Sequence, residues 1–134
     1  MDSVLDRAAC GPLHLGRPEI ANLVLDAICY GQDHMKHYEH HAYVIMANHV
    51  HLLITPLVDL PKITHSLKRV TARRANELLE LTGQRFWQEE SYDHLVHEER
   101  EFGRIVRYIE NNPVRAGLVA APHEFLWSSA RKAD

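Results

Sequence analysis

The run YEHHAYVIMANHVHLLITP, residues 38–56, most constrains what this chain can fold into. It is rich in β-branched and aromatic residues, which favour extended backbone. The pattern predicts two strands that meet near Ala47 and Asn48, the first over Tyr38–Met46 and the second over His49–Thr55. The second strand is so apolar that we expect it to lie centrally in a sheet.

Three amphipathic segments predict helices. The first begins at Pro18 and stops at Gly31, the second spans Pro61–Leu81, and the third covers EREFGRIVRYIENN and ends near Pro113. Their expected apolar faces consist of Ile20, Leu23, Val24, Ala27 and Ile28 in the first, Ile63, Leu67, Val70, Ala75 and Leu78 in the second, and Phe102, Ile105, Val106 and Ile109 in the third. Gly83 is the expected stop of the second helix.

The order of these elements predicts an α+β fold with a mostly antiparallel sheet flanked by helices. SYDHLVHE, residues 91–98, is typical of a further short strand. Residues 1–17 carry two glycines and a proline and are expected to be irregular. A length of 134 residues fits a single domain spanning residues 1–134.

Composition narrows the class of protein. The formal net charge is -3, so a surface that attracts nucleic acid must be a local patch. The two cysteines, Cys10 and Cys29, form no CxxC motif, which indicates a reducing compartment. No signal-peptide pattern opens the chain, and no apolar run approaches the roughly 20 residues of a membrane helix. We expect a cytoplasmic protein with no membrane partner.

His49 and His51 interrupt the apolar second strand. Residues i and i+2 of a strand point to the same side, so the two imidazoles project together. Such a pair can hold one divalent ion. Two histidines on a solvated face are an equally good interpretation of the spacing alone, but a central strand favours partners for polar groups.

The third helix brings two further polar side chains. Tyr108 and Asn112 are four residues apart, at one edge of the expected apolar face. That edge could overhang the two histidines, with Asn112 as a third ligand and Tyr108 as a nucleophile. The plainer alternatives are a boundary aromatic for Tyr108 and a helix-terminal residue before proline for Asn112.

Basic side chains concentrate on and after the second helix. They are Lys62, Lys68, Arg69, Arg73, Arg74 and Arg85. We expect them to meet nucleic-acid phosphates, and the adjacent Phe86 and Trp87 could stack on bases. A solvated helix face and a core aromatic pair are the alternatives.

NHVHLL and YIENNPVRAGLV, in this order, resemble the single-tyrosine HUH transposases, whose name stands for histidine, hydrophobic residue, histidine. The chain is most similar to the REP-associated tyrosine transposases, which are relatives of the insertion-sequence-200 type. The resemblance implies a fold related to the ferredoxin-like arrangement. It assigns metal binding to His49, His51 and Asn112 and makes Tyr108 the catalytic tyrosine.

The implied activity is metal-dependent nicking and strand transfer of single-stranded DNA, with Mg²⁺ or Mn²⁺ as cofactor. Tyr108 would form a 5′-phosphotyrosine link and release a 3′-OH, which another strand end can reverse without ATP. The expected partner is hairpin-containing single-stranded DNA, and a homodimer is one expected assembly. Tyr43 and Tyr92 are the next candidates for the nucleophile.

The chain departs from the family pattern in two ways. The family's first strand is not evident before Pro18, so we expect it to be lacking, together with a C-terminal tail, and Ala47 replaces the usual proline. A truncated remnant that binds DNA hairpins without cleaving them is therefore the alternative function. A histidine-triad hydrolase and an HxHxDH metallohydrolase both fail, because Leu52 and Leu53 occupy positions that would need Asp or His.

Overall fold

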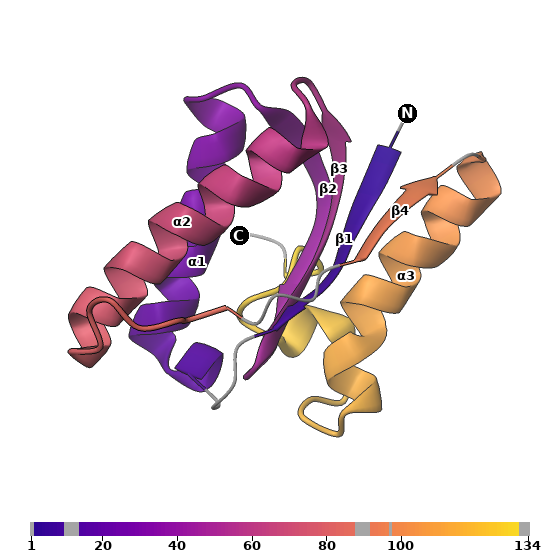
Figure 1. The fold of residues 1–134 in the computed structure, drawn as a ribbon. Coiled ribbons are helices and arrows are strands. Elements are labelled where there is room, and N and C mark those ends of the chain that lie inside the picture. Colours follow the sequence, from indigo (N-terminus) through magenta and orange to yellow (C-terminus); the bar gives the residue numbers. More distant parts are fainter. Residues whose placement is uncertain (1, 10–13, 88–91, 97, 132–134) are drawn as a thin grey trace.

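The computed structural model describes residues 2–9, 14–87, 92–96 and 98–131, with the side chains of 14–87 and 98–131. The described residues form four strands and three long helices, whose arrangement can be followed in Figure 1. In chain order they are β1 (Asp2–Ala9), α1 (Pro18–Asp33), β2 (Tyr38–Ile45), β3 (His49–Pro56), α2 (Leu60–Leu79), β4 (Tyr92–Val96) and α3 (Glu99–Arg115), with single 3₁₀ turns at His14–Gly16 and Pro122–Glu124. Within these residues, no helix is both long and apolar enough to cross a membrane.

The four strands form one sheet in the order β2-β3-β1-β4, and every neighbouring pair is antiparallel. β3 is therefore central, as its sequence predicts. Its two histidines sit opposite different partners, His51 facing Val44 of β2 and His49 facing Ala9 of β1.

The prediction that residues 1–17 are irregular and that the first strand is lacking is wrong. β1 occupies Asp2–Ala9 and pairs with β3 on one side and with β4 on the other. Its local pattern is weak, and its partner residues lie at least forty residues later in β3 and more than eighty residues later in β4. Pairing with distant strands overrides local preference, which is common in sheets.

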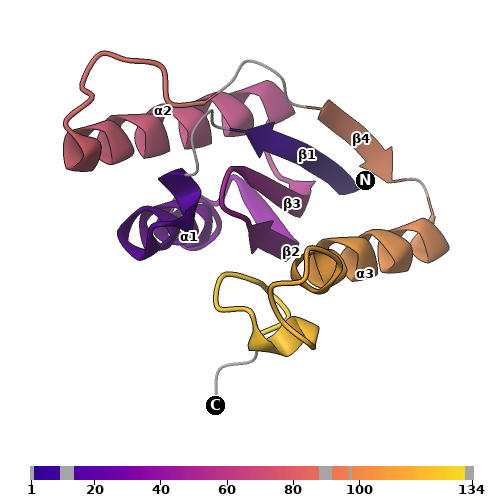
Figure 2. The same cartoon turned by 90° about the horizontal axis from the view of Figure 1, so that it is seen from below.

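Helices cover both faces of the sheet. α1 and α2 lie on one face and α3 lies on the other (Figures 1 and 2). Alternate residues of β3 serve the two layers: Val50, Leu52 and Ile54 join the larger core with α1 and α2, and Leu53 joins a smaller core with α3. The histidines have the same parity as Leu53, so they face the α3 layer.

The expected apolar faces of α1 and α3 are confirmed, because all their predicted residues belong to the two cores. In α2, Ile63 and Ala75 are buried and Leu67 packs against the larger core. Leu78 is 55% exposed, so its assignment to the core is wrong. It lies in the last turn of α2, which extends away from the sheet (Figure 1).

All three helices end at different residues from those predicted. α1 continues past Gly31 to Asp33. Gly31 has a packing role and does not end the helix, since a Cβ there would lie 2.8 Å from two atoms of the Tyr38 ring. α2 ends before Gly83, since Glu80 takes a left-handed conformation with φ 58° and its N–H bonds back to Asn76 and Glu77.

α3 runs through Pro113 instead of ending there. Proline lacks the N–H that would bond to the preceding turn, but the Pro113 ring is buried in return. The helix ends after Arg115, where Gly117 has a φ of 76° and the Leu118 N–H bonds to the Pro113 carbonyl at 3.0 Å. The two residues beyond Pro113 place Arg115 on the same helix as Tyr108.

Candidate active site

The two histidines of β3 form the centre of the site. Their ring centroids lie 4.9 Å apart, with the planes at 80°. His51 is only 4% exposed and His49 is half-buried, so the pair opens outward at the His49 side. Two imidazoles at this separation can both reach one ion, which fits the donor set of a divalent cation.

Asn48 fixes the orientation of His49. Its Oδ1 lies 2.9 Å from His49 Nδ1. An amide oxygen only accepts hydrogen bonds, so Nδ1 carries the proton and the lone pair of the neutral ring is on Nε2. Metal-binding histidines are commonly held in this way. Sequence reasoning missed this role, although the position of Asn48 next to His49 was a usable signal.

Tyr108 stands beside the buried histidine. Its ring centroid is 5.8 Å from that of His51, with the planes at 79°, and the side chain is 46% exposed. The position follows from the packing of α3, since the next residue, Ile109, is fully buried against β2 and β3. The structure thus brings a phenol that solvent and substrate can reach against a histidine pair from a different element.

Asn112 lies one turn after Tyr108 on α3 and is half-buried. Its side chain forms no hydrogen bond with the described residues. The same residues contain no group of three His, Cys, Asp or Glu side chains arranged to hold a metal ion. The structure therefore brings together two imidazoles as candidate metal ligands, and Asn112 as a third ligand stays a prediction.

Arg115 is a site residue that sequence reasoning missed. Its guanidinium carbon lies 5.2 Å from the centre of the Tyr108 ring, in a cation–π contact. The spacing of seven residues brings the two side chains to one face of α3, but only because the helix continues through Pro113. The arginine adds a fixed positive charge next to the phenol.

Other tyrosines are less suited to act here. Tyr43 packs against the larger core, on the side of the sheet away from His51. Burial raises the pKa of the Tyr43 phenol, and the nearby Cys29 adds to the effect, so this group holds its proton more firmly. The side chain of Tyr92 lies outside the described residues.

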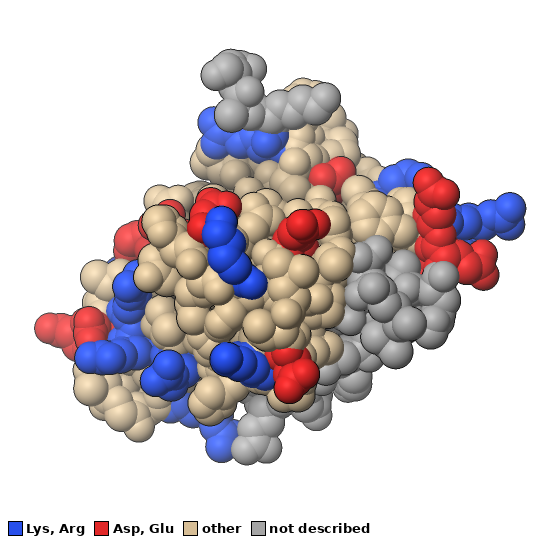
Figure 3. Space-filling view, turned by 90° about the horizontal axis from the view of Figure 1, so that it is seen from above, with Lys and Arg blue, Asp and Glu red and all other residues tan. Residues whose placement is uncertain are grey.

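The basic residues of α2 do not form a single face. Helical spacing places Lys62, Arg69 and Arg73 on one face. Arg69 also lines a groove between α1 and α2 together with Arg74, and Lys68 lines a separate small hollow beside Trp87. Consecutive helical residues differ by about 100°, which separates Lys68 from Arg69 and Arg73 from Arg74. Figure 3 shows Lys and Arg side chains gathered on one flank of the molecule.

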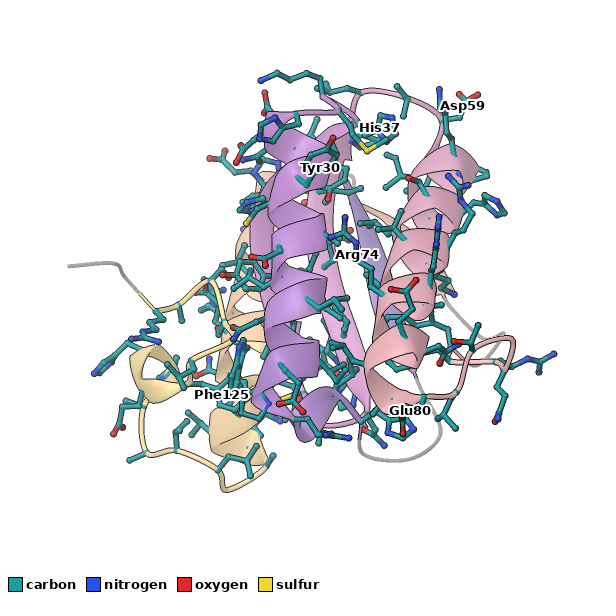
Figure 4. All side chains as sticks on the ribbon, turned by 90° about the vertical axis from the view of Figure 1, so that its left-hand side faces the viewer. Tyr30, His37, Asp59, Arg74, Glu80 and Phe125 are labelled. Atoms are coloured by element: carbon teal, nitrogen blue, oxygen red, sulfur yellow. The ribbon has the colours of Figure 1, made fainter. Side chains whose placement is uncertain are left out.

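The groove between α1 and α2 has a volume of about 360 Å³. Tyr30 and His37 lie at one end of it, Arg69 and Arg74 line the α2 side, and Leu67 contributes to the apolar floor. Figure 4 shows Arg74 at the gap between the two helices. Both arginine side chains are exposed, and neither forms an ion pair within the described residues.

The aromatic pair after α2 belongs to the core instead of a base-stacking surface. Phe86 is buried, and the indole N–H of Trp87 donates to the Thr71 hydroxyl at 2.8 Å. The two rings meet edge to face, 5.0 Å apart. Arg85, just before them, is exposed.

An antiparallel sheet with a histidine pair on its central strand and a tyrosine on the covering helix defines the single-tyrosine HUH class. Residues 19–112, most of the chain, match the family model described as "Transposase IS200 like". The chain belongs to this family. Curated protein sequences give no match.

Two solved structures are similar to the chain. One is a REP-associated tyrosine transposase bound to a REP hairpin, with a TM-score of 0.77 and 18% identity, covering 96% of this chain and 75% of that one. The other is a crystal structure assigned to a transposase of Deinococcus radiodurans, with a TM-score of 0.57 and 25% identity over 83% of this chain and 89% of that one. The similarity to the first structure supports the fold described above.

Proposed function

We propose that this transposase-family chain cleaves and rejoins single-stranded DNA through a covalent link to Tyr108. The observation that carries the proposal is the half-exposed Tyr108 ring packed 5.8 Å from buried His51. The family match supports DNA as the substrate.

In the proposed step, the Tyr108 oxygen bonds to phosphorus and the bond from phosphorus to the 3′ oxygen breaks. The phenol proton passes to water and the departing 3′ oxygen takes up a proton, so the products are a 5′-phosphotyrosine and a 3′-OH. A phenol with a pKa of about 10 is a weak nucleophile at neutral pH. Arg115, 5.2 Å from the ring centre, supplies positive charge where negative charge develops.

We propose that His49 and His51 hold a divalent ion, Mg²⁺ or Mn²⁺, with the Asn112 amide as a third ligand. When bound, the ion would polarise the phosphate that is to be cleaved. The 4.9 Å ring separation and the Asn48 contact that sets the His49 ring support this assignment. Because the protein would supply only these ligands, the ion would keep coordination positions for phosphate oxygens.

The DNA partner is proposed to be a single strand that carries a hairpin, as the hairpin bound by the REP-associated neighbour suggests. Lys62, Lys68, Arg69, Arg73, Arg74 and Arg85 remain the proposed phosphate contacts. We place the strongest of them in the α1–α2 groove, where Arg69 and Arg74 border an apolar floor.

Tyr108 and His51 meet within one chain, so the proposed chemistry does not require a second copy. The alternative function is that of a remnant that binds hairpins without cleaving them. Its main support is the expectation that the first strand is lacking. Because β1 completes the sheet, that support is removed.

The test is a denaturing gel with labelled DNA. The substrate is a hairpin flanked by randomised single-stranded segments, which samples any sequence preference, in the presence of Mg²⁺ or Mn²⁺. We expect wild type to give an SDS-resistant adduct and Tyr108→Phe to give none at any metal concentration. His49→Ala should also lose the adduct, with partial recovery in excess Mn²⁺. An adduct in Tyr108→Phe, or none in wild type, would contradict the proposal.

A further inference from the structure

The segment Trp127–Ser129 lies along the outer edge of β2, next to α3 (Figure 2). The Ile45 N–H donates to the Trp127 carbonyl at 2.9 Å, and the Ser129 N–H donates to the Tyr43 carbonyl at 3.0 Å. Val44 and Ser128 form an antiparallel bridge between these bonds. The segment therefore extends the sheet on the side of β2 that faces away from β3.

The Ser129 hydroxyl joins this edge to α3. Its oxygen accepts a hydrogen bond from the Tyr43 N–H at 2.9 Å and lies 2.8 Å from Glu110 Oε2. A second acceptor, the Tyr43 carbonyl, is more distant at 3.3 Å. A hydroxyl has one proton to donate, and the nearer carboxylate is the stronger acceptor. Ser129 thus connects the backbone of β2 to a side chain of α3.

Glu110 and Tyr108 lie on opposite flanks of α3. Ile109, between them in sequence, is fully buried against the sheet, and each neighbour is rotated about 100° from it. Tyr108 is on the flank that meets His51 of β3, and Glu110 is on the flank that meets Ser129 at the edge of β2. If α3 rolls about its own axis, both flanks move together.

We infer that Glu110 and Ser129 are positioning residues, which fix the rotation of α3 and so hold Tyr108 against the histidine pair. The inference rests on the proposed function of Tyr108. The apolar side chains of α3 pack on the sheet along one side of the helix. Such packing is non-directional, so it resists rotation of the helix about its own axis only weakly. A roll of about 10° moves a group about 6 Å from the axis by about 1 Å. A misplacement of that size can cost about 10²-fold in rate.

The test compares single-turnover rates of adduct formation. Ser129→Ala and Glu110→Ala should be about 10-fold to 10²-fold slower than wild type, with the DNA concentration for half-maximal rate unchanged. Glu110→Gln keeps a hydrogen-bond acceptor and should stay within a few-fold of wild type. The matched control is Ser128→Ala, which removes a buried hydroxyl from the same segment, where Ser128 Oγ bonds only to the Ala130 N–H among the described residues. It should leave the rate unchanged.

A second measurement does not depend on DNA cleavage. With 3-fluorotyrosine at Tyr108, the ¹⁹F resonance should shift or broaden in Ser129→Ala and Glu110→Ala, but not in Ser128→Ala or Glu110→Gln. If wild type forms no adduct, the proposed function fails and this resonance alone decides the positioning role. An unchanged resonance in Ser129→Ala, or an equal rate loss in Ser128→Ala, would overturn the inference.

Discussion

The two faces of the sheet are built differently, although the same strands supply both. Toward α1 and α2, β3 contributes Val50, Leu52 and Ile54 to a large, continuous apolar core. Toward α3, the same strand contributes Leu53 to a smaller core and then His51 and His49. The face toward α1 and α2 is covered by apolar packing. The face toward α3 is apolar at Leu53 and becomes a site open to solvent at the two histidines.

This difference shows how one strand can separate stability from chemistry. Because side chains alternate between faces, a substitution at position 52 acts on the large core and one at position 53 acts beneath α3. Apolar burial on the first face holds the domain together. The second face places Tyr108, so its packing has a further role in geometry.

The largest effects are expected for Leu52→Ala and Leu53→Ala, a pair of adjacent, fully buried residues on opposite faces. Each should lower the free energy of unfolding by about 2–5 kcal/mol, measured by urea denaturation. Leu52→Ala should leave the rate of adduct formation per folded molecule unchanged, while Leu53→Ala should reduce it because α3 loses its support. If the rate of adduct formation per folded molecule falls equally in both variants, the two faces are not separate in function.

The next largest effect concerns metal binding on the open face, the one toward α3. Asn48→Ala should weaken Mn²⁺ binding about 10-fold to 100-fold in calorimetry, because His49 loses the acceptor that sets its ring. Asn48→Asp keeps an oxygen acceptor and should retain the affinity. An imidazole must be neutral to bind the ion, so binding in wild type should weaken as the pH falls. Equal affinity in wild type and Asn48→Ala would exclude this role.

The smallest effect concerns the outer side of the closed face, the one toward α1 and α2. Arg74→Ala should reduce the slope of log affinity for single-stranded DNA against log salt by about 0.7, the value for one lost phosphate contact. Arg17→Ala removes the same charge from a residue that does not line the groove and pairs with Glu19 at 2.8 Å, and it should leave the slope unchanged. Equal changes in both variants would indicate a response to net charge without a contact in the groove.

The elements that sequence predicts well are those whose pattern is local. The apolar faces of α1 and α3 follow from their periodicity, and the shared side of His49 and His51 follows from the alternation of a strand. β1 was missed because its evidence lies in pairing with β3 and β4, far along the chain. Likewise, the Tyr108–Arg115 contact depends on α3 continuing through Pro113, against local preference.

The placement of Tyr108 near the histidines could be anticipated only in part. Its spacing from Asn112 alone favours a plain boundary aromatic, and only the resemblance of YIENNPVRAGLV to a family favours a catalytic tyrosine. Contacts that join α3 to the edge of β2 involve residues 19 positions apart, Glu110 and Ser129, and no local pattern marks them. Such contacts become visible only when both elements are placed.

The bonds that close the edge of β2 also set an order of events during synthesis. Ser129 follows Tyr43 by 86 residues, and Trp127 follows its partner Asn22 by 105. At 5–20 residues per second, a ribosome adds those 86 residues in roughly 4–17 s. Through that interval the Tyr43–Ile45 edge has no partner strand, and exposed edges invite pairing with other chains. A nascent chain therefore gains edge protection and a correctly rolled α3 in the same late step.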